Sequence, residues 1–187
     1  MPKSTQQRPL IQHWKPAKLW GRHRPHLSAQ DWVLNTQSLT AKIRQFCPQM
    51  KVEVLFEGQA LPLPSESAQL HCRTGETVWV RCVLLTCDTT PIIYARTVIP
   101  QMQSGNPWFA IKRLGNQPLG EVLFKSKKIH RTAFSWLKSN QVLCPSKCGT
   151  LLGRENFQKR SYWARQSKFT KAHATLLLTE VFLQLAV

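Results

Sequence analysis

Acidic residues are scarce in this chain. Its 187 residues include nine Asp and Glu against 26 Lys and Arg, which gives a net charge of +17 at pH 7. Clustered cations attract polyanions, so nucleic acid is one partner class to consider. Yet no helix-turn-helix, zinc-finger or RNP-type pattern accompanies the charge, and a solvated basic surface needs no ligand. We therefore expect no specific nucleic-acid binding; the charge could instead steer a small anionic substrate.

Long apolar runs are also missing. No stretch approaches the roughly 18–20 apolar residues of a membrane-spanning helix, and residues 1–7 lack the apolar core of a signal peptide. We expect a cytoplasmic protein with no membrane span, in which all six cysteines are reduced thiols. Cys144 and Cys148 are close in sequence, but no second Cys or His pair has the spacing of a zinc site, so we expect no metal or other cofactor.

One carboxylate interrupts an apolar segment near the C-terminus. Glu180 lies within Leu176–Leu183, which is short, almost wholly apolar and typical of a buried strand. A carboxylate there must find a cationic or hydrogen-bonding partner, or else lose its charge. Glu180 is therefore either half of a structural ion pair or part of a functional site.

A lone arginine lies in a second apolar segment. Arg96 is in the middle of Pro91–Pro100, which is rich in β-branched residues and has proline at both ends. If this strand and that of Glu180 lie in one sheet with matching faces, both charges project into one apolar chamber. The pair would be either a buried salt bridge or a dry pocket, with Arg96 binding a ligand carboxylate and Glu180 facing a hydroxyl or a developing charge.

Coarse patterning predicts an α+β domain. Ser28–Asp31 has the form of a helix N-cap, and Leu39, Ile43 and Phe46 have the spacing of a second helix. Strands are expected over residues 51–56, 77–86, 91–100 and 176–183. The second and third of these form a hairpin, and short helices are expected over residues 118–124 and 129–137. We expect a single domain with a mainly antiparallel sheet and helices on one side.

Four blocks of sequence resemble, in order, the signature blocks of chorismate pyruvate-lyase, also called chorismate lyase. They are Ala95–Pro100, Leu114–Gly120 running into Leu123–Phe124, Trp163–Ser167, and Leu176–Leu183. The spacing from Trp163 to Glu180 is also similar to the family's. The resemblance begins near residue 28, so we expect a basic extension over residues 1–27 and a chorismate lyase-like domain over residues 28–187.

The resemblance implies a sheet of about six antiparallel strands with helical flaps over an internal site. It also implies conversion of chorismate to 4-hydroxybenzoate and pyruvate, the first committed step toward ubiquinone, by a metal-free monomer that its product inhibits. The family's substrate contacts fall on Leu39, Arg96, Leu119 and Glu180. Arg96 and Glu180 would be catalytic, with Arg96 on a substrate carboxylate and Glu180 near the ring hydroxyl. Leu39 stands where the family more often has methionine, and Leu119 begins a helix that could offer a backbone N–H.

Some features depart from the family pattern. Arg165 is followed by Gln166 where two arginines would be expected, which puts a second ion pair there in doubt. About twenty extra residues, including a loop over residues 138–158, separate the second and third blocks. Two alternatives stay open: a non-catalytic effector-binding domain like that of certain bacterial repressors, which share this fold, or a basic nucleic-acid-binding relative. We expect the roughly 30 residues before the first helix to be too few for a DNA-binding domain.

Overall fold

The computed structural model describes residues 14–16, 27–139 and 161–184. Its strands are β1 (Lys15–Pro16), β2 (Lys51–Ala60), β3 (Val78–Cys87), β4 (Thr90–Ile99), β5 (Ile129–Arg131), β6 (Ser135–Ser139), β7 (Tyr162–Lys171) and β8 (Ala174–Phe182). Its helices are α1 (Leu27–Val33), α2 (Leu39–Phe46), α3 (Pro64–Leu70), the 3₁₀ helix Phe109–Arg113, and α4 (Leu119–Lys125).

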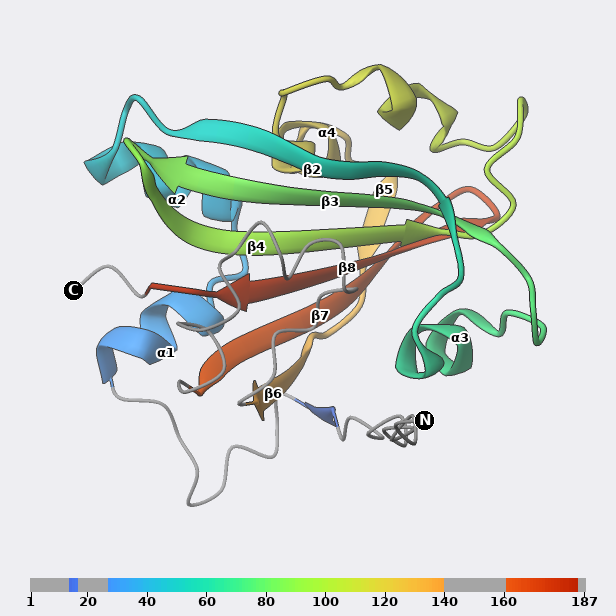
Figure 1. Ribbon diagram of the computed structural model, residues 1–187, viewed down its shortest axis with the longest axis horizontal. Coiled ribbons are helices and arrows are strands. Elements are labelled where there is room, and N and C mark those ends of the chain that lie inside the picture. The colour runs from blue at the N-terminus through green and yellow to red at the C-terminus, as the bar shows by residue number, and fades with distance from the viewer. Residues whose placement is uncertain (1–13, 17–26, 140–160, 185–187) are drawn as a thin grey trace, which may run out of the picture.

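The described strands form one antiparallel sheet (Figure 1). Its order is β1-β6-β7-β8-β4-β3-β2, with β5 also paired to β7. The expected α+β fold with a mainly antiparallel sheet is confirmed. The sheet has eight strands rather than about six, and the two shortest, β1 and β5, have only two and three residues. Such short edge pairings leave no alternating pattern to detect in the sequence.

Several predicted elements are present. The β3–β4 hairpin turns at Asp88, where Cys87 is opposite Thr90, and α2 and α4 lie where helices were expected. The helix predicted over residues 129–137 is wrong, because this segment forms β5 and β6, both paired with β7. A short apolar run is compatible with either a helix or a strand, and here the pairing with β7 makes it a strand.

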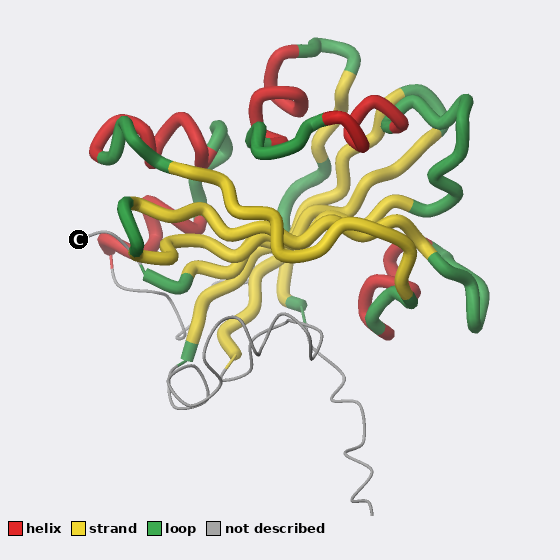
Figure 2. Tube along the Cα trace, turned by 45° about the horizontal axis from the view of Figure 1, so that its top comes forward, coloured by secondary structure: helices red, strands yellow, loops and turns green. Residues whose placement is uncertain are grey.

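Alternation along the strands gives the sheet two buried faces. The α4 face carries side chains such as Thr97 and Leu178, which lie opposite each other on β4 and β8. Leu178 joins a core cluster with Leu123 of α4. The α3 face carries Val80, Tyr94 and other core residues, and α3 covers part of it. Helices therefore lie on both sides of the sheet, which Figure 2 shows as a single curved layer.

Candidate active site

Arg96 and Glu180 lie on neighbouring strands but on opposite faces of the sheet. The register pairs Ala95 with Glu180 and Arg96 with Thr179. Directly opposed residues share a face and successive residues alternate, so Glu180 faces α4 and Arg96 faces α3. The expectation that both charges enter one chamber is wrong. The alternation within each strand can be read from sequence, but the register between the strands cannot, and a shift of one residue reverses the face.

Arg96 is held on the α3 face by a carboxylate from α3. Its Nε and Nη2 donate to the two carboxylate oxygens of Glu66 at 2.7 and 3.0 Å, and each side chain is only 1% exposed. Burial by itself would lower the Arg96 pKa, but the hydrogen bonds and charge of Glu66 outweigh it and raise that pKa. The guanidinium also approaches the buried thiol of Cys82. The two donors of the Arg96 guanidinium are therefore used to hold α3 against the sheet.

A small closed pocket lies on the α4 face, under α2 and α4. Its free volume is about 40 Å³. Leu39 and Leu119 line it, as does Glu180, so three of the four predicted substrate-binding residues lie around one space. The arginine that completes it is Arg81 of β3. The other lining residues include Thr40, Val52, Val83, Leu85, Ala95, Thr97, Gln117, Gly120, Leu123, Phe124 and Leu178.

Arg81 is the site residue that the sequence reasoning missed. It is 2% exposed, and its partner in the hairpin is Thr97, which also lines the pocket. Nη1 donates to the Glu57 carboxylate at 2.5 Å, and Nη2 donates to the Gly115 carbonyl at 2.6 Å. A lone charge in an apolar strand was the signal that selected Arg96. Arg81 carries the same signal within the predicted strand 77–86.

Glu180 is fixed by an arginine on the next strand. Arg165 lies opposite it on β7 and donates from Nε to a carboxylate oxygen of Glu180 at 2.6 Å. Arg165 is 1% exposed and also donates to the carbonyls of Val33 and Asn35, beyond the strands. The nearby Arg131 has a pKa lowered to about 10, first because its own guanidinium is buried and then because of the charge of Arg165. The charge of Glu180 opposes that shift. Glu180 therefore lies among cations.

Gln166, where the sequence departs from the family pattern, faces away from this site. It lies on the α3 face, where its amide nitrogen donates to Thr179 Oγ1 at 2.7 Å and its amide oxygen accepts from Gln69. The ion pair with Glu180 comes from Arg165, the first residue of that dipeptide.

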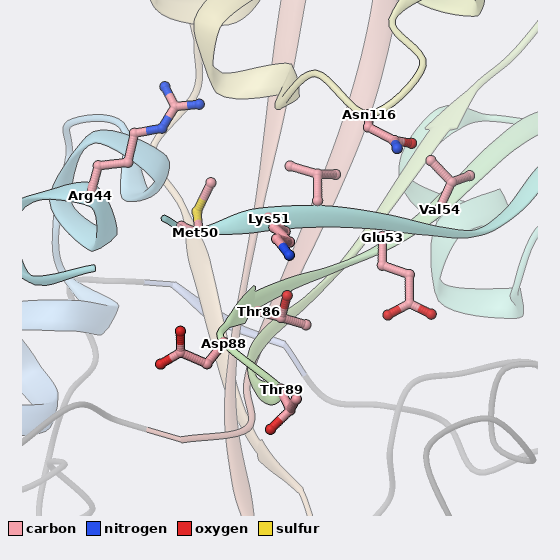
Figure 3. Close-up of a pocket in the computed structure, with 10 residues that line it drawn as sticks. Arg44, Met50, Lys51, Glu53, Val54, Thr86, Asp88, Thr89 and Asn116 are labelled. Atoms are coloured by element: carbon pink, nitrogen blue, oxygen red, sulfur yellow. The ribbon is translucent and has the colours of Figure 1, made fainter. Parts of the chain in front are cut away.

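An open cleft of about 850 Å³ borders the closed pocket (Figure 3). It is bounded by the end of α2, β2, the β3–β4 turn and the loop before α4. Its lining residues are Arg44, Met50, Lys51, Val52, Glu53, Val54, Thr86, Asp88, Thr89 and Asn116. Val52 lines both spaces. The cleft is larger, but its charged groups are exposed and of mixed sign. The closed pocket combines a buried cation with an apolar wall, which makes it the candidate site.

The cysteines correct another expectation. Cys47, at the end of α2, and Cys87, at the end of β3, form a disulfide with a Cα–Cα distance of 6.0 Å. The expectation that all six are reduced thiols is wrong for this pair, because the fold brings together positions that are 40 residues apart. Cys72 and Cys82 are free. The pair at positions 144 and 148 lies outside the described residues.

Over residues 14–16, 27–139 and 161–184, no three His, Cys, Asp or Glu side chains gather closely enough to hold a metal ion. Within the same residues, no helix is long and apolar enough to cross a membrane. Most of the loop expected over residues 138–158 lies outside this part of the chain.

Similar structures share the fold of this chain. PhnF from Mycobacterium smegmatis superposes with a TM-score of 0.55 at 14% identity, over 80% of this chain and 64% of that one. A GntR-family transcriptional regulator from Bacillus cereus superposes with a TM-score of 0.52 at 8% identity, over 74% and 94%. Identities this low show a common architecture and no more.

Sequence comparison is more specific. A probable chorismate pyruvate-lyase of Hydrogenovibrio crunogenus is 43% identical over 172 residues, which cover 92% of this chain and 90% of that protein. A second, from Aromatoleum aromaticum, is 34% identical over 174 residues, or 86% and 88% of the two chains. The profile of the chorismate lyase family matches residues 13–187. The resemblance seen in four short blocks thus extends over nearly the whole chain, which belongs to the chorismate lyase family.

Proposed function

We propose that this protein converts chorismate to 4-hydroxybenzoate and pyruvate in the closed pocket. The observation that carries the proposal is the presence of Arg81 and Glu180 around one apolar space, in a chain of the chorismate lyase family. Chorismate has two carboxylates, a ring and a ring hydroxyl. A buried cation, apolar walls and a partly buried acceptor complement these groups.

Arg81 takes the binding role that the sequence suggested for Arg96. Its guanidinium binds a substrate carboxylate, and burial strengthens that contact because little water competes for it. Leu39 and Leu119 enclose the ring from α2 and α4. Glu180 faces the hydroxyl-bearing side of the ring, with its orientation set by Arg165.

The reaction breaks the ether bond between the ring and the enolpyruvyl group. The bonding electrons leave with the enolpyruvyl oxygen, and the adjacent hydroxyl-bearing ring carbon loses a proton. The ring becomes aromatic, and the departing enol takes up a proton to become pyruvate. Aromatisation supplies the driving force, so the protein has mainly to orient the dianion, exclude water and stabilise charge on the leaving oxygen. Glu180 assists the proton transfer, and no metal takes part.

Arg96 acquires a structural role in this proposal. Glu66 occupies its fork on the opposite face of the sheet, where Arg96 ties α3 to β4. We further propose that the protein is a cytoplasmic monomer whose 4-hydroxybenzoate leads toward ubiquinone.

The test is to incubate purified protein with chorismate and quantify both products. We expect 4-hydroxybenzoate and pyruvate in equal amounts, in a reaction that survives exhaustive EDTA treatment. Saturable chorismate binding without either product would favour an effector-binding domain instead. Loss of turnover that added Mg²⁺ or Zn²⁺ restores would overturn the metal-free mechanism.

A further inference from the structure

The closed pocket is too small for a ligand the size of chorismate. Its free volume is about 40 Å³, whereas ligand pockets commonly measure roughly 300–1,000 Å³. One wall must therefore lie farther out when a ligand is bound, and the same wall must move for the ligand to enter or leave. The floor consists of paired strands in the core, so the candidates for movement are the two helices above it, α2 and α4.

α2 is fixed to its surroundings. Cys47, at its C-cap, is joined by the disulfide to Cys87 at the end of β3. Lys42, in its middle, donates to the Asp31 carboxylate of α1 at 2.5 Å. Ile43 is fully buried in the core beneath it. A covalent link, an ion pair and core packing hold the helix in place.

α4 has weaker attachments. It is seven residues long, and its N-cap Pro118 makes no side-chain capping bond. Leu123 is its fully buried residue, Leu119 and Val122 pack partly buried against the same cluster, and Phe124 touches Phe169 edge-on although it is 41% exposed. A helix of seven residues with a single fully buried side chain and no covalent link belongs to the low-stability end of a structure, where local opening is cheapest. α4 is therefore the wall that moves.

An ion pair and a close backbone approach hold α4 against α2. Arg44 Nη1 of α2 lies 2.7 Å from Glu121 Oε1 of α4, and both side chains are partly exposed. The next contact is a close approach at Gly120, where a Cβ atom would lie 2.9 Å from Ser38 Oγ and 3.3 Å from Thr40 Oγ1. At Gly120 the backbone of α4 thus lies directly against the side chains of Ser38 and Thr40, and the Arg44–Glu121 ion pair joins the two helices further along.

One partner of this ion pair faces the open cleft. Arg44 also lines the cleft, and Asn116 lines it from the loop before α4 (Figure 3). Val52 lines both spaces. Movement of α4 away from α2 would join the pocket to the cleft through this border.

We infer that the Arg44–Glu121 ion pair is a latch that holds α4 closed on α2, and that its opening sets how fast a ligand leaves through the cleft. The identity of that ligand rests on the proposed function, whereas the latch itself does not. Partly exposed ion pairs are weak, so removal of this one should raise the population of the open state about two- to fivefold. Charge reversal should reach the upper end of that range, because it replaces attraction by repulsion.

The ligand-free protein provides the first test. Hydrogen exchange at the amides of α4 should accelerate about two- to fivefold in Arg44→Glu and in Glu121→Arg, and should return to the wild-type rate in the double charge swap. Lys125→Ala is the matched control, because Lys125 pairs with Glu121 within α4, at 3.8 Å, without reaching α2. Its exchange should stay at the wild-type rate. Single variants that exchange like wild type, or a swap that fails to restore them, would overturn the latch.

The second test measures dissociation of 4-hydroxybenzoate by stopped-flow displacement in the same four variants. The single reversals should release it faster by the same factor as they accelerate exchange, and the swap should release it at the wild-type rate. Unchanged release despite faster exchange would refute the exit route. If no variant binds 4-hydroxybenzoate while exchange still follows the charge pattern, the proposed function falls and the latch stands.

Discussion

Arg81 and Arg96 belong to successive cross-strand pairs of the β3–β4 hairpin, yet their guanidinium groups face different sides of the sheet. Cys82 is the residue opposite Arg96, so Arg81 faces the other way. Glu66 holds Arg96 on the face away from the pocket, whereas Arg81 lines the pocket while its Nη atoms donate to Glu57 and to the Gly115 carbonyl. The two buried arginines therefore have separate surroundings: Arg96 holds a helix, and Arg81 lines the pocket in which we propose that the substrate binds.

Loss of the pocket charges should abolish most of the activity. Arg81→Lys should lower chorismate turnover at least about a hundredfold, because an ammonium group cannot reproduce the two-donor fork of guanidinium. Glu180→Gln should have an effect of similar size, while its amide oxygen can still accept a hydrogen bond from Arg165. Steady-state kinetics would measure both effects. Near-normal kcat/KM in either variant would remove that residue from the mechanism.

Arg96 should matter for stability instead. Arg96→Met leaves the Glu66 carboxylate buried without its partner, which should lower the free energy of unfolding by about 3–5 kcal/mol. The double variant Arg96→Met with Glu66→Leu should recover much of that loss, because no unpaired charge remains. Urea unfolding measures the stability, and kcat per folded molecule should stay within a few-fold of wild type. A stable Arg96→Met protein without activity would return Arg96 to the active site.

At the scale of residues, the sequence predicts which charged side chains are candidates for a site, but not which of them contact each other. A charge in an apolar strand is visible in the sequence, and Glu180 was found in that way. The partner of Glu180 depends on the register of β8 against β4 and β7. Contacts between residues distant in sequence determine that register. The pairing of Arg165 with Glu180 therefore comes from the structure, whereas Arg81 carries the same signal as Arg96 and only its place beside the pocket needs the structure.

Among the elements, α2 has the most unusual attachment. Its C-cap is linked covalently to the last residue of β3, while its first residue, Leu39, lines the pocket. The disulfide therefore stabilises a helix that forms one wall of the candidate site. Cytoplasmic disulfides are usually reduced, so the redox conditions of an assay should affect the stability of this wall.

Removal of the disulfide should destabilise the fold. Cys87→Ser should lower the free energy of unfolding by about 2–4 kcal/mol under oxidising conditions, because the unfolded chain loses a cross-link over 40 residues. Cys72→Ser is the matched control, since Cys72 is a free thiol. Wild-type protein in excess reductant should unfold like Cys87→Ser. Identical unfolding curves for wild type with and without reductant would contradict the link.

The elements that sequence patterns located are those with strong local signals. The hairpin has alternating apolar strands and a polar turn, and α2 has an N-cap serine at Ser38. The sequence of β5 and β6 predicts a helix because its short apolar runs fit the period of a helix as well as that of a strand. Only the pairing with β7 distinguishes a strand from a helix here. The disulfide was missed because no pattern connects the end of α2 to the end of β3, 40 residues away.

The whole molecule has a large positive charge around a small closed site. The net charge of +17 comes from composition and would suggest nucleic acid if taken alone. The pocket offers another use for the charge, since a cationic molecule attracts a dianion from a distance and salt screens that attraction. The family itself was recognisable from four short blocks, whereas the helices on both sides of the sheet were not foreseen.

Product release should limit turnover in this protein. 4-Hydroxybenzoate keeps the ring and one carboxylate of the substrate, so it retains much of the contact with Arg81, Leu39 and Leu119. α4 must then move before the product can leave the small pocket. Rapid-mixing experiments should show a burst of product in the first turnover, and 4-hydroxybenzoate should inhibit at or below the substrate KM. A linear time course without inhibition at millimolar product would contradict a sequestered site.

The most direct test of the central claim is a crystal structure of the protein with 4-hydroxybenzoate. The account predicts the ring between Leu39 and Leu119, the carboxylate within about 3 Å of the Arg81 guanidinium, and the phenol oxygen beside Glu180. It also predicts that α4 lies farther from the sheet and that the Arg96–Glu66 pair is unchanged. A ligand found in the open cleft, or bound to Arg96 in place of Glu66, would contradict the account.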